Sequence, residues 1–383
     1  MAFHQVLPLD IDSLDKSPCD GQNLVFQSRP MGYQAAPGQV YPRKQPLGIC
    51  GPGTGQAGAV VAKWSQTPPA TPWSGFVSLR DATIIAKGLT LTGDDRILLG
   101  RGLMLNPKSF PPTPMVSLAA KDPAMAGAYR VDIPEETLRV AGTLCNIGLP
   151  GARIYGHWIV DVLPRVYRTL SHGLAIDRYV MGETQKPWQT AILEALDIAG
   201  DKVLFWDARQ YRLEAERLVV PTFARISSEL HEEFMAVHIF LREKHAAPEL
   251  DKPATDRLFI ARAEGGNRQL ANRDAVEAVF ADQGFEIFRP EHWPFVEQIK
   301  KLARVAGECG LGMHNTVFCR PGTRVGVLQS SANLSFLQGQ IALHAQHDLY
   351  YLIGMPTDPK EASLKSSWRV EIEDVRRFIA MLS

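Results

Sequence analysis

Two α/β lobes preceded by a small β-rich segment are the fold that this sequence predicts, on three observations. A chain of 383 residues exceeds what one ordinary core holds, which indicates two domains plus extra segments. From residue 138 onward, short apolar runs alternate with helical segments, the pattern of a parallel sheet covered by helices. A polar stretch with a proline, residues 245–255, interrupts the pattern and indicates a linker. We therefore expect two Rossmann-like lobes that face a cleft.

The composition is that of an ordinary globular protein. Hydrophobic residues make up 45% and charged residues 21%, which excludes wholesale disorder and a fibrous chain. Because 41 basic side chains balance 41 acidic ones, no net field attracts a polyanion, and nucleic acid is not expected as a partner. A small phosphate ligand stays compatible, since a pocket needs only a few cations.

The cysteines and the N-terminus predict a cytoplasmic protein without a membrane segment. Five cysteines without CxxC spacing favour reduced thiols over a disulfide framework or a zinc site. No basic region followed by an apolar run opens the chain, and no run of about 18 apolar residues occurs, so neither a signal peptide nor a membrane span is expected. Peripheral attachment to the inner membrane and homo-oligomerisation both stay open.

The first 135 residues divide into two segments. Residues 1–75 mix Pro, Gly and Gln without periodicity, which predicts an irregular N-terminal extension. Residues 76–135 contain β-type runs at 76–79, 82–85 and 96–99, which predict a small antiparallel sheet ahead of the first lobe.

The first lobe, with its linker helix, is expected over residues 136–250. Its predicted strands are 138–145, 178–181, 203–206 and 218–221. Its predicted helices are 156–170, a helix opened by Pro187 and closed by Gly200, and the amphipathic helix 230–244.

The second lobe, with a closing helix, is expected over residues 251–383. Its predicted strands are 257–262, 285–288 and 323–328, with a thin strand around 304–306, and its predicted helices are 273–282, 294–304 and 315–318. Asn272 is the expected N-cap of the 273–282 helix, and Gly284 ends it. In such folds ligands bind at the carboxyl ends of the strands, so the motifs there carry the functional prediction.

A histidine and an aspartate open the 156–170 helix. His157 and Asp161 are four residues apart and therefore share a helix face. An imidazole and a carboxylate at a helix start are typical of an acid/base pair, with either one deprotonating an acceptor hydroxyl. The structural alternative is that His157 caps or packs and Asp161 binds nearby backbone.

Two arginines follow the first strand of the second lobe. Arg262, Arg268 and Asn272 occupy a loop that contains Gly265-Gly266. Guanidinium groups bind phosphate through paired hydrogen bonds, and a Gly-rich loop lets backbone approach a diphosphate. The loop predicts a site for a departing nucleoside diphosphate; the alternative is surface arginines and a simple N-cap.

A second Gly-rich segment runs from Gly307 to Asn315 and is predicted to be a turn that leads into the short helix. Exposed N–H groups at a helix start favour a pyrophosphate, and Gly310, Gly312 and His314 belong to the same candidate site. The segment is neither a Walker P-loop nor a GxGxxG fingerprint.

Other features predict no site. Asp10 and Asp12 have the spacing of a metal-binding acidic pair but lie in the irregular leader, and no histidine pair has HExxH spacing. A thiol nucleophile at Cys309 lacks an orienting acid. We expect no metal and no cofactor.

Three segments in a fixed order resemble glycosyltransferase family 61. They are residues 156–165, then 262–272, then 295–298 followed by 310–318 and Pro321-Gly322, within a resemblance that covers about residues 80–345. The resemblance implies a GT-B fold, inverting sugar transfer, donor binding largely in the C-terminal lobe and usually no metal requirement. In bacteria, such proteins are associated with capsular or other surface polysaccharides.

The resemblance also implies roles for single residues. His157 and Asp161 become catalytic candidates, and Trp158 and Arg165 acceptor-side candidates. The donor-side candidates are Arg262, Arg268, Asn272, Gly310, Gly312, His314 and Asn315. Cys309 departs from the pattern, because the better-known eukaryotic members have a histidine there, in G-x-H-G-A-G-L-x-N.

The sequence therefore predicts a metal-independent, inverting glycosyltransferase that moves a hexosyl or pentosyl group from a nucleotide-sugar donor to a glycan, lipid-linked or other hydroxyl acceptor, in surface polysaccharide synthesis. The departure at Cys309 motivates an alternative, a catalytically silent sugar-nucleotide or glycan-binding protein. A dehydrogenase on the same lobes lacks the dinucleotide fingerprint.

Overall fold

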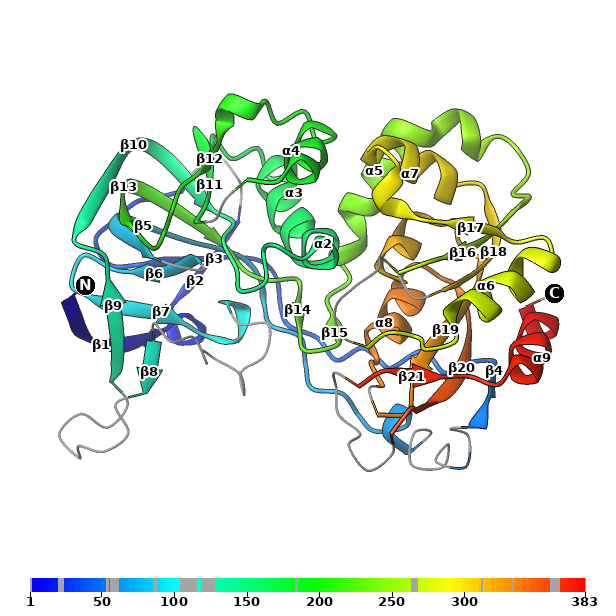
Figure 1. The fold of residues 1–383 in the computed structure, drawn as a ribbon. Helices are drawn as coiled ribbons and strands as arrows, with labels where there is room; N and C mark the ends of the chain where they lie inside the picture. Colours follow the sequence, from blue (N-terminus) through cyan, green and yellow to red (C-terminus); the bar gives the residue numbers. More distant parts are fainter. Residues whose placement is uncertain are drawn as a thin grey trace. The chain divides into compact units, whose positions relative to one another are not determined.

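The computed structural model describes residues 2–19, 24–52, 55, 62–85, 88–103, 116–118, 128–182, 185–262, 268–310, 313–332, 334–358 and 366–382. The chain forms two compact units, each around its own sheet (Figure 1). The first unit combines Met1–Gln39 with Ala70–Ser227, and the second combines Val40–Pro69 with Ser228–Ser383. The predicted α/β class is confirmed.

The 12-stranded sheet of the first unit has a parallel and a mostly antiparallel part. Its order is β12-β11-β10-β13-β5-β6-β7-β1-β9-β8, with β3 paired to β5 and β2 to β3. The strands are β1 (Ala2–Asp10), β2 (Lys16–Pro18), β3 (Met31–Ala36), β5 (Ser74–Ile85), β6 (Leu89–Leu91), β7 (Arg96–Leu99), β8 (Val116–Leu118), β9 (Tyr129–Ile133), β10 (Glu136–Asn146), β11 (Arg178–Met181), β12 (Val203–Phe205) and β13 (Tyr211–Pro221). Strands β10 to β13 are parallel to one another, as a Rossmann-like lobe requires.

The helices of the first unit lie mainly between its parallel strands. They are α2 (Tyr155–His157), the π-helical turn η6 (Trp158–Val162), α3 (Leu163–Ser171) and α4 (Pro187–Glu194), with the 3-10 turns η1 (Ile11–Ser13), η4 (Arg101–Leu103) and η7 (Gly200–Lys202). The predicted helix from Pro187 to Gly200 ends early, at Glu194. Asp197 has φ +62°, a left-handed conformation that a right-handed helix cannot continue through.

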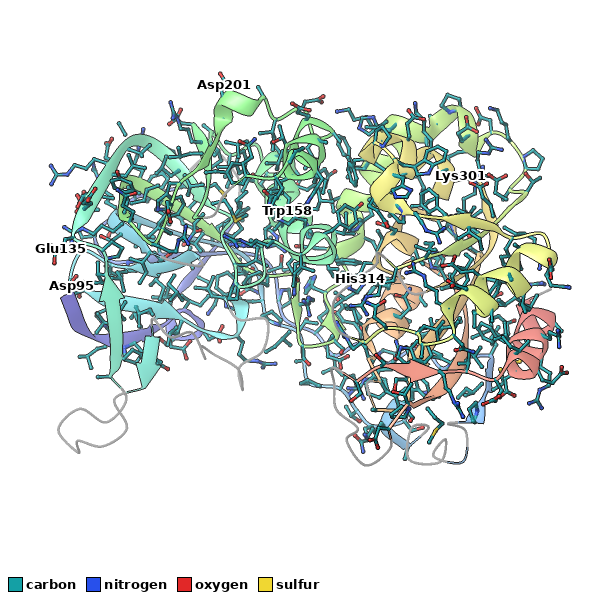
Figure 2. The ribbon with its side chains drawn as sticks, viewed as in Figure 1. Asp95, Glu135, Trp158, Asp201, Lys301 and His314 are labelled. Atoms are coloured by element: carbon teal, nitrogen blue, oxygen red, sulfur yellow. The ribbon has the colours of Figure 1, made fainter. Side chains whose placement is uncertain are left out.

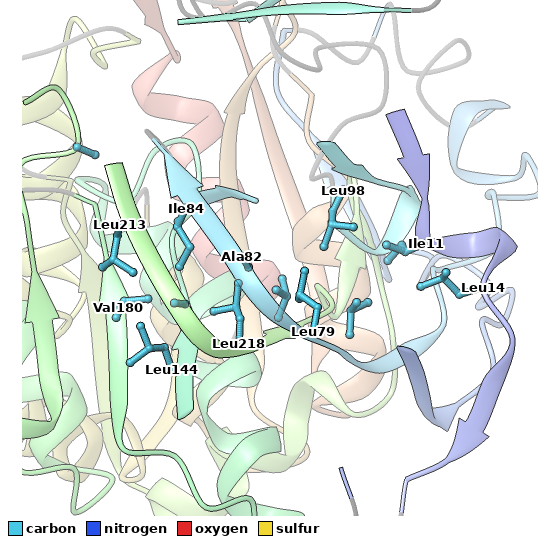
Figure 3. Packing of buried hydrophobic residues seen from close by; sticks show 14 of the residues in the cluster. Ile11, Leu14, Leu79, Ala82, Ile84, Leu98, Leu144, Val180, Leu213 and Leu218 are labelled. Carbon is cyan, nitrogen blue, oxygen red and sulfur yellow. The ribbon is translucent and has the colours of Figure 1, made fainter. Parts of the chain in front are cut away.

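The β-rich segment predicted ahead of the first lobe is not a separate sheet. Strand β5 pairs antiparallel with β13, from Phe76 opposite Pro221 to Ile84 opposite Leu213. Side chains from both parts of the sheet therefore share one hydrophobic core, in which Leu79 and Ile84 pack with Leu144, Val180 and Leu213 (Figure 3).

The prediction of an irregular extension over residues 1–75 is wrong. Strand β1 pairs with β7 and β9, and β3 pairs with β5, so this segment supplies strands to the first sheet. Strand β4 (Gly48–Cys50) pairs with β20 of the second sheet. These strands form through backbone hydrogen bonds to partners that are distant in the sequence. The segment itself shows little hydrophobic periodicity, so its strands could not be predicted from local patterns.

The sheet of the second unit is parallel except at one edge. Its order is β17-β16-β18-β19-β20-β21, with β4 paired to β20. The remaining strands are β15 (Glu229–Leu230), β16 (Asp256–Ile260), β17 (Glu286–Phe288), β18 (Val305–Gly310), β19 (Arg324–Ser330), β20 (Asp348–Pro356) and β21 (Trp368–Arg369). Strand β14 (Arg225–Ile226) belongs to the first unit. The helical elements are α5 (Phe234–Leu250), α6 (Arg273–Asp282), η8 (Pro290–His292), α7 (Phe295–Leu302), η9 (Met313–Phe318), α8 (Leu337–His344) and α9 (Ile372–Leu382).

Alternating side chains of the parallel strands face two cores. Phe259 and Leu352 pack with Phe280 of α6 and Phe378 of α9. The second core contains Trp64 together with Val325, Val327, Leu349 and Tyr351. A parallel sheet buried on both faces is the arrangement that the alternation of strands and helices predicts.

The expected lobe boundary near residue 250 lies inside the second unit, which resumes at Ser228. Helix α5 contacts α7 and η9 of that unit. The helix also extends into the predicted linker, passing Pro248 with a kink at Ala246. The amphipathic pattern predicted this helix correctly, but only its tertiary contacts decide which core it covers.

The predicted turn at Gly307 is wrong in its first half. Residues 307–310 belong to β18, where Gly307 pairs with Arg257 and Arg324. Hydrogen bonds from strands on both sides hold these glycines extended despite their low strand propensity. No helix in the described part of the chain is long and apolar enough to cross a membrane.

Candidate functional site

Three charged or ionisable side chains meet at the start of one helix in the first unit. Nδ1 of His157 lies 2.6 Å from Oδ2 of Asp161. Arg225 donates from Nε to Oδ1 of the same carboxylate at 2.5 Å and from Nη2 to Oδ2 at 3.0 Å. The Asp161 side chain is fully buried, whereas that of His157 is 29% exposed. The histidine is therefore the member of this cluster that a ligand can reach.

The local backbone places the imidazole. His157 ends α2 and Asp161 lies in the π-helical turn η6, a conformation frequent at functional sites. Gly151, in the preceding loop, has φ +87°, and a Cβ there would lie 3.0 Å from Cδ2 and 3.2 Å from Nε2 of His157. A glycine is required at this position both for its left-handed backbone and for the room it leaves to the ring.

The charges around Asp161 decide the protonation states. Burial raises the pKa of the Asp161 carboxyl, but the charge of Arg225 and the hydrogen bonds from His157 and Arg225 outweigh it and lower the pKa to about 2. Asp161 is therefore a carboxylate at neutral pH and only accepts hydrogen bonds. His157 must donate from Nδ1, which in the neutral imidazole leaves the lone pair on Nε2. Of the two base candidates, the geometry favours His157, with Asp161 orienting it.

The acceptor-side assignment of Trp158 and Arg165 is corrected by the structure. Trp158, which is labelled in Figure 2, is fully buried. It donates from Nε1 to the carbonyl of Ala152 at 2.7 Å. Arg165 is 2% exposed. Its guanidinium donates to the backbone carbonyls of Asn146, Ile147, Gly148 and Pro221. Both side chains face the core and hold the ends of β10, β13 and the following loop, so neither is free for an acceptor.

The predicted phosphate-binding residues of the second unit converge on one edge of its sheet. The order β17-β16-β18-β19-β20 changes direction between β16 and β18, and ligands of such sheets bind outside the carboxyl ends of the strands at that switch point. Arg262 and Arg268 follow β16, and Gly310 ends β18 just before η9. Tertiary structure therefore brings two separate motifs to the position where an α/β sheet holds its ligand.

The two arginines form a cationic pair. Arg262 is half-buried and Arg268 is exposed. Burial lowers the pKa of Arg262, and so does the repulsion between its guanidinium group and that of Arg268. Within the ranges that the structure describes, no carboxylate pairs with either group. An anion bound here would weaken the repulsion between the two guanidinium groups and would supply a counter-charge.

The turn after β18 contributes a buried amide. Asn315 is 3% exposed, and no donor in the described part of the chain reaches its Oδ1. A buried oxygen that accepts no hydrogen bond costs free energy unless a ligand or a water molecule donates one to it. His314 is half-buried, whereas Gly312 and the side chain of Cys309 lie outside the described residues.

Asn272 makes contacts with the chain as well as being a donor-side candidate. It precedes α6 but makes no side-chain cap, contrary to the expected N-cap. Its Nδ2 donates to the carbonyl of Val370 at 2.7 Å, and its Oδ1 accepts from the Val370 amide at 3.4 Å. One N–H and one lone pair of the amide stay outside these two bonds, so the donor-side role of Asn272 stays a prediction.

Sequence reasoning missed Arg225. It lies 64 residues from Asp161, in a two-residue strand that no motif contains. The signal that could have found it is a single cation inside the apolar stretch 219–226, because a charged residue in such a stretch needs a buried partner.

Comparison with known families agrees with this geometry. Residues 155–326 match the family described as Glycosyltransferase 61. The matched stretch is shorter than the predicted resemblance and less than half of the chain, but it contains all three motif segments. The matched stretch is therefore a glycosyltransferase domain. Its family is glycosyltransferase 61, as the ordered motifs predict. A comparison with curated proteins gave no match.

Proposed function

We propose that this protein is an inverting, metal-independent glycosyltransferase of the GT-B type that uses a nucleotide-sugar donor. The observation that carries the proposal is the cluster of His157, Asp161 and Arg225, which fixes a partly exposed imidazole with Nε2 as its proton acceptor. The Glycosyltransferase 61 match begins two residues before this histidine and supports sugar transfer as the reaction class.

In the proposed reaction, Nε2 of His157 takes the proton of the acceptor hydroxyl. The hydroxyl oxygen forms a bond to the anomeric carbon of the donor, and the bond from that carbon to the diphosphate oxygen breaks, with its electron pair leaving on the diphosphate. One displacement inverts the configuration. The proton remains on His157, where the Asp161 carboxylate stabilises the imidazolium.

The second unit would hold the donor. Negative charge grows on the departing diphosphate, and guanidinium groups bind such oxygens through strong, charge-assisted hydrogen bonds. Arg262 and Arg268 repel each other and lie at the switch point with η9 and Asn315. We propose that these groups take the role that a metal ion has in other sugar transferases.

The acceptor is proposed to be a glycan or a lipid-linked glycan of a surface polysaccharide, on the family resemblance. Neither Trp158 nor Arg165 supports an acceptor site, since both are buried among structural partners. The partly exposed side chain of His157 is the point from which the proposed acceptor site extends.

The decisive experiment is a donor panel. Purified protein is incubated with UDP-, GDP-, CMP- and dTDP-sugars and oligosaccharide acceptors, and products are detected by mass spectrometry, with and without EDTA. The proposal expects transfer that is insensitive to EDTA, with inversion seen by NMR of the product, and loss of transfer in His157→Ala. Donor binding without any turnover would instead support the catalytically silent protein, and a retained anomeric configuration would contradict the mechanism.

A further inference from the structure

Arg225 determines how the Asp161 carboxylate is held. Its side chain is 10% exposed and uses three donor groups: Nε and Nη2 bind the two oxygens of Asp161, and Nη1 binds the carbonyl of Ser227. A guanidinium that binds both oxygens of a carboxylate fixes its plane as well as its position. Oxygen Oδ2 is shared between Arg225 and Nδ1 of His157, so the orientation of the imidazole depends on Arg225.

We propose that Arg225 is a positioning residue for the base: it fixes the Asp161 carboxylate, and that carboxylate fixes the ring of His157 with Nε2 as the proton acceptor. The inference rests on the proposed function, in which His157 deprotonates the acceptor. Arg225 itself touches neither substrate nor the reacting atoms in this scheme.

Among the described residues, Arg165 of α3 also acts on Asp161 through its charge. It is bonded to four backbone carbonyls and is not part of the clamp. Its cation remains when Arg225 is replaced, so a change in the tautomer of His157 can be assigned to Arg225.

Two substitutions separate position from charge. Arg225→Lys keeps a cation but cannot bind both carboxylate oxygens in the same plane, whereas Arg225→Gln removes the charge. The matched control is Arg168→Gln, since Arg168 is also a buried arginine of the first unit but donates to the backbone and side chain of Thr222. The control reports the cost of losing a buried guanidinium away from the base.

The first measurement is kcat and KM at one pH. In Arg225→Gln, we expect kcat to fall at least about tenfold with the donor KM unchanged. Arg225→Lys should also lower kcat, because it cannot bind both carboxylate oxygens in one plane. Arg168→Gln should change neither kcat nor the KM. A folded Arg225→Gln protein with the wild-type rate overturns the proposal.

The second measurement needs no activity. Long-range ¹H–¹⁵N NMR of the histidine rings, with His157→Asn for assignment, should show the Nδ1–H tautomer of His157 in the wild type. The tautomer should become mixed in Arg225→Gln or, should that variant not fold, in Arg225→Lys. A wild-type Nε2–H tautomer overturns the positioning role. A wild type that transfers no sugar removes the proposed function alone, because the ring NMR still tests the link from Arg225 to His157.

Discussion

Arg43 and Glu229 are joined by two hydrogen bonds across 186 positions of sequence: Nε and Nη2 of Arg43 donate to Oε1 of Glu229 at 3.3 and 2.7 Å. Arg43 also donates to the carbonyl of Lys63 and lies 4.6 Å from the ring centroid of Phe336. Residues 40–69, which carry no recognised motif, are therefore anchored within the second unit.

Arg43→Ala is expected to destabilise the protein by about 3 kcal/mol, because it leaves the Glu229 carboxylate buried without its cation. The measurement is urea unfolding followed by circular dichroism. Arg139→Ala is the control, since Arg139 is 83% exposed beside Glu214 and should cost less than about 1 kcal/mol. Equal losses in the two variants would mean that the anchor adds no stability.

His157→Ala is expected to lower kcat by about 10²- to 10⁴-fold, the range for loss of a general base, with little change in donor KM. Steady-state transfer of the donor found in the panel measures it. His292→Ala, an exposed histidine of η8, is the control and should retain wild-type turnover. A retained rate in His157→Ala would show that another group accepts the proton.

Asp161 makes a pH-dependent contribution to stability. Its pKa is lowered from 3.8 to about 2 in the folded state, so the contribution is complete above the unfolded value and is lost as the pH falls through 3.8 towards 2. The difference in free energy of unfolding between the wild type and Asp161→Asn should shrink by about 2 kcal/mol over that window. Urea unfolding at a series of pH values measures it, with Asp282→Asn, at the exposed end of α6, as the control. A difference that stays constant down to pH 2 would contradict a depressed pKa.

Arg262→Ala should weaken pyrophosphate binding by about ten- to hundredfold, the value of one charge-assisted hydrogen bond. Inorganic pyrophosphate is the probe because it carries the shared chemistry of every candidate donor, and isothermal titration calorimetry measures its Kd. Arg376→Ala removes an arginine of α9 that is 60% exposed and pairs with Glu373, and should leave the Kd unchanged. Equal Kd values for the wild type and Arg262→Ala would place the diphosphate elsewhere.

Local signals predicted local structure well. The strand at 178–181 and the helix at 273–282 begin and end where the sequence places them. Gly284 has φ +80°, as the predicted stop of that helix requires. The contact between His157 and Asp161 is equally local, because a spacing of four within one helix brings the two side chains together.

Pairings between distant segments escaped prediction. The strands of residues 1–50, the continuous sheet through β5 and β13, and the extension of β18 to Gly310 all depend on backbone partners far along the chain. Trp158 and Arg165 belong to the same motif as His157 and Asp161, residues 156–165, but their side chains face the core. The motif alone does not reveal this orientation.

The sequence by itself determined the α/β class, the match of residues 155–326 to Glycosyltransferase 61 and the helix face that His157 and Asp161 share, because propensity, periodicity and ordered motifs act over short stretches. Only the tertiary structure decided which member of that pair is buried and which is partly exposed. The carboxylate is buried and held by Arg225 from 64 residues away, and the Coulomb interaction depends on distance through space and on the surrounding dielectric, not on separation along the chain.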